Sequence, residues 1–463
     1  MSYRWSLSQV LPYLFMRCSD VGTEQGDLQN PKLKCRQILE KRKKGEASLS
    51  QFYKYFLFSL SLLHQFLHLF ILLIMESLSS LKSVATLSCY MSFSLILILN
   101  PAFASHNCDF PAIFNLGDSN SDTGGLSAAF SPPTPPYGET FFHMPVGRFS
   151  DGRLTIDFIA ESLGLPYLSA YLDSVGSNFS HGANFATAAS TIRLPEKIIP
   201  GGGFSPFYLE VQYEQFMQFK SRSQIIKKQG GIFTDLLPME EYFSRALYTF
   251  DIGQNDLGAG FFGNMTVEEV RASVPDIVSK FSVDVKSIYN LGGRSFWIHN
   301  TGPIGCLPYI LANFPITSAQ MDGAGCATPY NEVAQYFNQK LKEAIVQLRK
   351  DLPFAAITYV DVYSAKYSLI SQPKKYGLEY PLIACCGYGG KYNYSDSVGC
   401  GGTISVNGSQ VFVGSCEHPS VRVNWDGIHY TEAANKLVFE QIVDGALCDP
   451  PVSLKMACHR HAH

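Results

Sequence analysis

The stretch that decides the fold is "FNLGDSNSDTGG", residues 114–125. A short apolar run ends at Gly117, and Asp118 and Ser119 follow at once, before a series of small polar residues. Apolar runs without strict alternation are typical of strands buried on both faces of a parallel sheet. In open α/β sheets, ligands bind beyond the carboxyl ends of the strands. Ser119 therefore stands either in a simple linker or in a loop that presents a nucleophile.

Three further runs have the same character, and helical patterns separate them. The runs are "RALYTFDIG" (245–253), "RSFWIHNTG" (294–302) and "AAITYVDVY" (355–363). Acidic residues open a helical pattern over 267–293, which Pro275 interrupts. A second pattern, over 331–353, has one apolar stripe. Alternating strands and helices predict an α/β domain with a central parallel sheet. The stripe consists of Val333, Phe337, Leu341, Ala344 and Leu348.

Composition and charge exclude two classes of protein. The 463 residues include 46% hydrophobic ones, which is too many for a disordered chain. Lys and Arg number 36 against 39 Asp and Glu, a formal net charge of −3. Because no basic excess is available to neutralise phosphates, we expect no nucleic-acid partner.

The N-terminal region predicts secretion. Residues 75–104 have an apolar core and end in Ala102-Phe103-Ala104, an A-x-A cleavage site, so we interpret them as a signal peptide. Residues 1–74 are then an upstream extension outside the natural product, and 105–463 form a single domain. The rival interpretation is a membrane anchor at 52–74, a run long enough to cross a bilayer. We expect an extracellular protein with no stable membrane insertion once the signal is removed.

Cysteines and glycosylation sequons agree with that location. Nine of the twelve cysteines follow residue 105, as suits an oxidising compartment, and an odd number leaves one thiol free or paired outside the chain. Cys306 and Cys326 are a plausible pair, worth roughly 3 kcal/mol in the chain-entropy model. A second cluster of four cysteines predicts a Gly-rich loop held by disulfides, and the sequence leaves their pairing open. The N-x-S/T sequons predict N-glycans. The cluster is Cys385, Cys386, Cys400 and Cys416, and the sequons are at Asn178, Asn264, Asn393 and Asn407.

A serine nucleophile needs a base, and the base needs an acid that orients it. The best candidate is His429 in "NWDGIHYTEAANKLVFEQIV" (424–443), because Asp426 precedes it by three residues and Gly427 lets the backbone bend. Thr431 can cap the helix that follows. An oxyanion would need preset donors. The candidates are the N–H of Ser119, an N–H from residues 180–190 and the Asn255 side chain.

Four motifs in order give a resemblance to a known family. "FNLGDSNSDTGG", "GANFATAAS" (182–190), "TFDIGQND" (249–256) and "WDGIHYTEAAN" (425–435) resemble the plant GDSL esterase/lipases of the SGNH hydrolase superfamily. The resemblance implies a flavodoxin-like three-layer α/β/α fold. It also implies Ser119 as nucleophile, Asp426 and His429 as its partners, and Gly182 and Asn255 as oxyanion donors. The residues of these motifs are most similar to those of the early-nodulin-like branch of the family, which includes members named α-L-fucosidase.

The chain departs from the family pattern at two places. Asn120 stands where many members have leucine or phenylalanine, and the block after Gly182 lacks a further glycine. The N–H of Ala188 or Ala189 is therefore an alternative oxyanion donor. Asp118 is expected to tie its loop by accepting backbone N–H bonds rather than to act as a catalytic acid.

These features predict a secreted, glycosylated serine carboxylester hydrolase that forms an acyl-enzyme. Lipids, acetylated polysaccharides and phenolic esters all remain open as substrates. No metal-ligand spacing is present, and neither metal nor cofactor is expected. One alternative is a glycosidase of the α-L-fucosidase type acting on cell-wall oligosaccharides, and another is a non-catalytic wall protein. A glycosidase would need two carboxylates. The candidates for those are Asp118, Asp122, Asp256 and Asp426.

Overall fold

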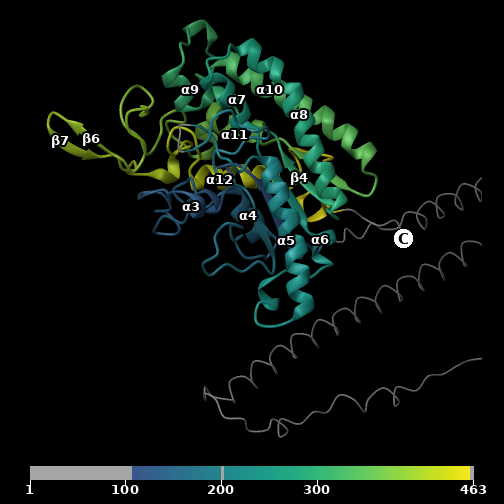
Figure 1. Cartoon of the computed structure of the whole chain (residues 1–463). Coiled ribbons are helices and arrows are strands. Elements are labelled where there is room, and N and C mark those ends of the chain that lie inside the picture. Colours follow the sequence, from purple (N-terminus) through teal and green to yellow (C-terminus); the bar gives the residue numbers. More distant parts are fainter. Residues whose placement is uncertain (1–106, 200–202, 459–463) are drawn as a thin grey trace, which may run out of the picture. The chain divides into compact units, whose positions relative to one another are not determined.

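A central sheet forms the core of the protein (Figure 1). The computed structural model describes residues 107–199 and 203–458. The sheet has the order β2-β1-β3-β4-β5-β8, in which β8 alone is antiparallel. The first five strands have the order of a flavodoxin-like doubly wound sheet, so the predicted fold is confirmed. The strands are β1 (Ile113–Gly117), β2 (Gly182–Asn184), β3 (Leu247–Asp251), β4 (Ser295–His299), β5 (Ala356–Val360) and β8 (Cys448–Asp449).

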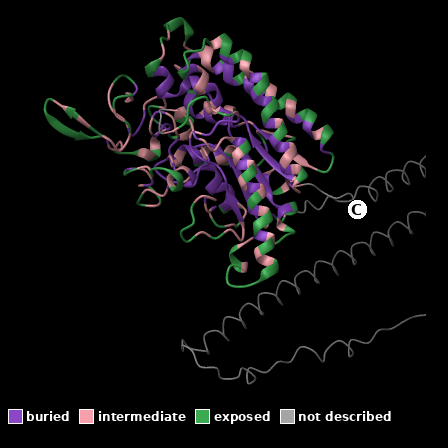
Figure 2. Cartoon of the chain, viewed as in Figure 1, coloured by how far each residue is buried: buried purple, intermediate pink, exposed green. Residues whose placement is uncertain are grey.

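Helices cover both faces of the sheet, and the strand side chains divide between them. Phe114 and Leu116 of β1 pack in the cluster that contains α5, α8 and α10, whereas Ile113 packs in the cluster that contains α4, α11 and α12. Successive strand residues point to opposite faces, so both faces are apolar and the strands are buried throughout (Figure 2). The helices are α3 (Gly125–Ala129), α4 (Thr155–Ser162), α5 (Leu209–Gln229), α6 (Tyr242–Arg245), α7 (Gln254–Phe262), α8 (Val267–Asn290), α9 (Pro308–Asn313), α10 (Thr328–Asp351), α11 (Val362–Ser371) and α12 (Glu432–Ile442).

The two long helical patterns form α8 and α10, which lie side by side (Figure 1). A capping box between Thr266 and Glu269 begins α8. The helix continues through Pro275, contrary to the expected interruption, because that residue is on the exposed face while the opposite face packs on the sheet. Thr431 caps α12 by accepting a hydrogen bond from the Ala434 N–H, as predicted.

Disulfides hold the loops outside the sheet. Cys306 pairs with Cys326 as predicted, and Cys448 is the free thiol of the described residues. The four-cysteine cluster is resolved into Cys385–Cys416 and Cys386–Cys400. A fourth bridge, Cys108–Cys458, was not foreseen.

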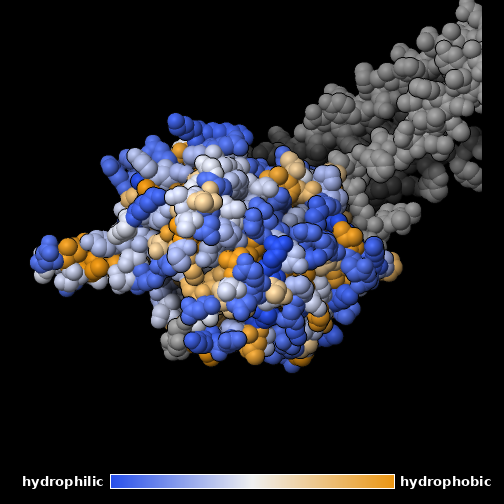
Figure 3. All heavy atoms as spheres, turned by 90° about the horizontal axis from the view of Figure 1, so that it is seen from above, coloured by the Kyte–Doolittle hydropathy of each residue, from blue (hydrophilic) through white to orange (hydrophobic). Residues whose placement is uncertain are grey.

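The segment between Cys400 and Cys416 projects as a small hairpin of β6 (Thr403–Val406) and β7 (Ser409–Phe412). Figure 3 shows this projection with hydrophobic side chains along it. Val411 and Phe412 are among the exposed apolar residues of the chain.

The predicted upstream extension (1–74) and signal peptide (75–104) lie outside the described residues. Among the residues that are described, no helix combines the length and apolar character needed to cross a bilayer.

Candidate active site

Ser119 follows the carboxyl end of β1, which lies between β2 and β3 in the sheet. The strand runs so close to β3 that a Cβ on Gly117 would lie 2.6 Å from the Asp251 carbonyl oxygen. The Asp118 N–H donates to that same oxygen at 3.0 Å, and Asp118 Oδ1 accepts the Asn120 N–H at 2.9 Å. Asp118 therefore ties the loop, as predicted. Ser119 itself is only 5% exposed, so its small neighbours do not leave it in the open.

Asp426 and His429 form a close pair on the loop that precedes α12. Asp426 Oδ2 lies 2.6 Å from His429 Nδ1, and Asp426 Oδ1 accepts the backbone N–H groups of Ile428 and His429 at 3.0 and 2.8 Å. Burial disfavours the Asp426 anion, but His429 and these N–H donors outweigh it and lower the pKa of Asp426 to about 2. The carboxylate thus stays ionised and holds one imidazole nitrogen.

The second imidazole nitrogen of His429 makes no hydrogen bond with the described residues, and neither does the Ser119 hydroxyl. Catalytic hydrogen bonds are often long or absent when no substrate is bound. One imidazole nitrogen and the Ser119 hydroxyl are thus both without a partner among the described residues.

Lys366 of α11 connects the loops of Ser119 and His429. Its ammonium lies 3.2 Å from Asn120 Oδ1, next to Ser119, and 4.6 Å from the ring centroid of Tyr430, next to His429. Both loops therefore meet on one buried amine. Burial lowers the pKa of Lys366, while Asp251 and Asp118 oppose that shift. Sequence reasoning missed Lys366, because a lone lysine in a helix carries no signal of burial.

A buried polar cluster lies behind the serine loop. Burial and the neighbouring Asp251 raise the pKa of Asp118. Burial also disfavours the Asp251 anion, but His299, whose Nδ1 lies 3.0 Å from Asp251 Oδ2, and Lys366 lower its pKa on balance. The side chains of Asp118, Asp251, His299 and Lys366 thus share the space beneath the Ser119 loop.

Two further loops reach the same sheet edge. The Thr187 N–H donates to the Gly117 carbonyl oxygen at 3.2 Å, and the Ala188 N–H donates to Asp122 Oδ2 at 2.7 Å. Asn255, in the first turn of α7, donates through Nδ2 to the Ser190 carbonyl oxygen at 2.9 Å. The amide of Asn255 therefore lies beside the 187–190 loop, and both lie near the end of β1.

Gly182 does not belong to this edge, and its predicted role as an oxyanion donor is wrong. It pairs with Ile113, the first residue of β1, about 13 Å along the strand from Gly117 at 3.3 Å per residue. Its N–H donates to the Phe179 carbonyl oxygen. Gly182 is glycine for another reason: φ is +111°, and a Cβ would lie 1.8 Å from the Ile113 carbonyl oxygen.

The alternative donor Ala189 is placed differently. Its φ is +62°, a left-handed conformation that normally favours glycine. Its N–H makes no hydrogen bond with the described residues, whereas the N–H of Ala188 is already used by Asp122. Of the two alternatives, Ala189 has the free donor.

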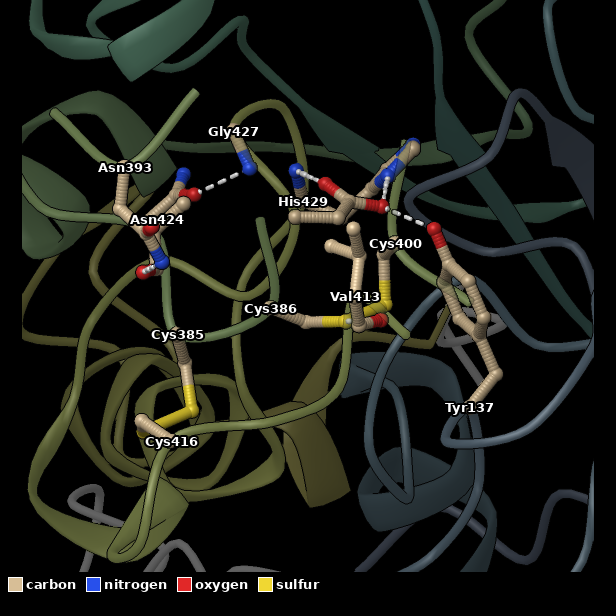
Figure 4. Close-up of a disulfide and its surroundings, with 12 residues drawn as sticks. Tyr137, Cys385, Cys386, Asn393, Cys400, Val413, Cys416, Asn424, Gly427 and His429 are labelled. Atoms are coloured by element: carbon tan, nitrogen blue, oxygen red, sulfur yellow. Dashed lines mark hydrogen bonds and ion pairs between the residues drawn. A yellow bond between two sulfur atoms is a disulfide. The ribbon is translucent and has the colours of Figure 1, made fainter. Parts of the chain in front are cut away.

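Tyr137 contacts Asp426, and the sequence did not predict this contact. Its hydroxyl donates to Asp426 Oδ2 at 2.8 Å, across a separation of 289 residues. Figure 4 shows its ring pointing from a separate loop toward the Asp426–His429 pair. Nothing in "PPYGETFF" (135–142) marks one aromatic residue as a partner of a distant carboxylate.

The strand order and the loops gathered at its carboxyl edge are those of an SGNH-type α/β hydrolase. The family model for GDSL-like lipase/acylhydrolase matches residues 113–442, and the chain belongs to this family. It is 66% identical over 368 residues to an esterase from Hevea brasiliensis, covering 79% of this chain and 93% of that protein. It is 61% identical over 366 residues to the GDSL esterase/lipase ENOD8 from Medicago truncatula, covering 79% and 94%.

A third relative carries a different activity in its name. Alpha-L-fucosidase 3 from Arabidopsis thaliana is 55% identical over 375 residues, covering 81% of this chain and 99% of that protein. The esterase and GDSL esterase/lipase relatives, together with the family match, identify the chain as a carboxylester hydrolase.

Proposed function

We propose that the protein cleaves its ester through an acyl-enzyme on Ser119. His429 takes the Ser119 proton, the serine oxygen attacks the ester carbonyl, and Asp426 holds the imidazole and stabilises its charged form. The tetrahedral intermediate collapses with cleavage of the ester C–O bond, and His429 gives its proton to the departing alcohol. Neutral His429 then takes a proton from water, which attacks the acyl group; breakage of the acyl–serine bond releases the acid and returns the proton to Ser119. The single observation that carries this proposal is the 2.6 Å Asp426–His429 contact on a loop that meets the Ser119 loop at Lys366.

The oxyanion of the tetrahedral intermediate needs donors at the same edge. We assign this role to the N–H of Ser119, the N–H of Ala189 and the second Nδ2 proton of Asn255. The first Nδ2 proton is fixed by the Ser190 carbonyl oxygen, so the amide is oriented before substrate binds. Such preset donors act without reorganisation during the reaction.

The proposal is tested by labelling with an organophosphonate probe. Mass spectrometry of the digested protein is expected to find the adduct on Ser119, and Ser119→Ala is expected to abolish both labelling and p-nitrophenyl butyrate hydrolysis. Ser127→Ala, at a half-buried serine of α3 whose hydroxyl oxygen is covered, is the matched control and should leave labelling intact. Hydrolysis that survives in Ser119→Ala would overturn the assignment.

Secretion and N-glycosylation are part of the same proposal. The four disulfides of the described residues suit an oxidising compartment. N-terminal sequencing of the secreted product should begin after Ala104. The substrate is proposed at the level of a lipid, an acetylated polysaccharide or a phenolic ester, and a panel of acyl lengths and acyl types distinguishes these.

A glycosidase activity is the second candidate, because one relative is named alpha-L-fucosidase 3. The four carboxylates that could serve it are occupied or covered. Asp122 accepts three consecutive backbone N–H groups and that of Ala188, and Asp256 accepts those of Ile192 and Arg193. Asp118 is 1% exposed and Asp426 is bound to His429. Rates on p-nitrophenyl butyrate and p-nitrophenyl fucoside separate the candidates; a fucosidase rate that survives Ser119→Ala would favour the second.

A further inference from the structure

We propose that Tyr137 is a positioning residue of this hydrolase, which fixes the carboxylate of Asp426 and through it the imidazole of His429. The inference rests on the proposed function, in which Asp426 and His429 act on Ser119. It adds a fourth side chain, from a loop far away in the sequence, to the groups that the reaction requires.

The hydrogen bonds of Asp426 divide its two oxygens between two tasks. Oδ1 accepts only backbone N–H groups of its own loop, from Ile428 and His429. Oδ2 accepts the His429 ring at 2.6 Å and the Tyr137 hydroxyl at 2.8 Å. Within the described residues, Tyr137 is the one donor to Asp426 from outside that loop. The hydroxyl therefore holds the very oxygen that orients the base.

The ring of Tyr137 is fixed from several directions. It lies edge-on to Trp425 at 5.9 Å and to Phe149 at 6.0 Å between ring centroids, and Phe149 in turn lies 5.4 Å from the His429 ring. Burial and the neighbouring Asp426 carboxylate raise the pKa of Tyr137 far above its ordinary value. The hydroxyl thus keeps its proton near neutral pH and donates to the carboxylate.

The disulfide pair supports this arrangement (Figure 4). Tyr137 packs against the cluster of Cys385, Cys386 and Trp425. The Cys386 N–H donates to the Trp425 carbonyl oxygen at 2.6 Å, directly before Asp426. A Cβ on Gly401, next to Cys400, would lie 2.6 Å from the Pro135 carbonyl oxygen. One stapled loop therefore touches both the Tyr137 segment and the Asp426 segment.

Tyr137→Phe removes the hydroxyl and keeps the ring. The matched control is Tyr367→Phe, because Tyr367 also donates to a carboxylate, Asp322, at 2.8 Å, and neither partner hydrogen-bonds to Asp426 or His429. A hydrogen bond to a charged group is worth enough that kcat of Tyr137→Phe should fall roughly ten- to a hundred-fold with KM little changed. Tyr367→Phe should keep its kcat.

Two readouts separate positioning from a general structural role. The proton resonance of His429 Nδ1–H should shift in Tyr137→Phe, because its acceptor oxygen has lost a second donor, and it should stay in place in Tyr367→Phe. In an Asp426→Ala background, adding Tyr137→Phe should cause no further loss of kcat, since the hydroxyl acts through the carboxylate. Losses that add fully in the double variant would overturn the proposal, as would an unchanged kcat in Tyr137→Phe.

Failure of the underlying function gives a different result. If wild-type Ser119 does not react with the organophosphonate, the acyl-enzyme proposal fails. If wild type and Tyr137→Phe are labelled at Ser119 at the same rate, only the role of Tyr137 fails. A melting temperature for each variant shows that the compared proteins are folded.

Discussion

At the scale of single residues, Ala189 shows that a left-handed backbone conformation can be held by a residue other than glycine. With φ at +62°, it adopts a conformation that costs a side chain of ordinary type about 1 kcal/mol and glycine almost nothing. Its neighbours are held on both sides, Ala188 by Asp122 and Ser190 by Asn255. The loop geometry is therefore imposed by its contacts, and the free N–H is a result of that geometry.

Asn255 allows a test of the proposed oxyanion donors. Asn255→Ala should lower kcat by roughly a hundred- to a thousand-fold with a small change in KM, because the donor acts mainly on the developing oxyanion. Asn313→Ala is the control, since Asn313 also donates through Nδ2, to Asp396 at 2.9 Å, on an exposed surface. Steady-state kinetics on one p-nitrophenyl ester measure both. A fall in kcat of less than three-fold for Asn255→Ala would contradict the assignment.

The four sequons differ in their surroundings. The Nδ2 atom of Asn393 donates to the Ala384 carbonyl oxygen at 2.8 Å, and the residue is half-buried beside the stapled loop. Asn178, Asn264 and Asn407 are exposed. A glycan on Asn393 would have to replace an Nδ2 hydrogen of a half-buried amide that already contacts the Ala384 carbonyl oxygen, so we expect glycans at the three exposed sites and none at Asn393. Mass spectrometry of glycopeptides from the secreted protein checks this, and full occupancy at Asn393 would contradict it.

At the scale of elements, the strands and long helices could be predicted because their signals are local. Apolar runs at 113–117, 247–251, 295–299 and 356–360 became the parallel strands, and the stripe over 331–353 became the buried face of α10. Strand β2 has three residues and no such signal. The error at Gly182 follows from this, because its distance from Ser119 depends on the pairing of β2 with β1.

The residues of the candidate site also differ in whether a local sequence signal marks them. Asp426 and His429 are three residues apart, so a single turn brings them together and the sequence can show it. Tyr137 and Lys366 reach the site from 289 and 246 residues away. Tyrosine and lysine are common residue types, and only the packed chain shows which tyrosine and which lysine contact the loops of Ser119 and His429.

We expect different consequences from removing the Cys386–Cys400 disulfide, which holds the loop beside Tyr137, and the Cys108–Cys458 disulfide. Replacing Cys386 and Cys400 with serine should lower kcat in the folded protein, because the loop contacts both Tyr137 and Trp425, the residue before Asp426. Replacing Cys108 and Cys458 should cost roughly 2–5 kcal/mol of stability with kcat unchanged in the folded protein. Urea unfolding and kinetics on both double variants give the comparison. Equal kcat values in the two would contradict it.

At the scale of the whole molecule, buried carboxyl groups set the pH dependence of stability. Burial raises the pKa of Asp151 and Asp256 to about 6, and burial together with Glu210 raises that of Asp284 to about 7. Between about pH 4 and pH 7 the folded state therefore binds more protons than the unfolded state, so the free energy of unfolding falls as pH rises. Asp426 acts in the opposite sense, but only below about pH 4, where it is protonated in the unfolded chain first.

The protein should thus be more stable at pH 5 than at pH 8, by on the order of a few kcal/mol. Urea unfolding at pH 5, 6.5 and 8 measures the slope. Asp284→Asn, on the helix α8 and outside the site, removes one of the titrating groups and should flatten the dependence. Equal or greater stability at pH 8 in the wild type would contradict the prediction.

The bridge between Cys108 and Cys458 joins positions 350 residues apart, close to both ends of the described chain. A protease that cuts an exposed loop between them, such as the one at Gly230 and Gly231, produces two polypeptides that are still one covalent molecule. Damage of this kind would be invisible on a non-reducing gel and would appear as two bands only after a thiol is added. A single cleavage of this kind would therefore leave both fragments of the fold joined.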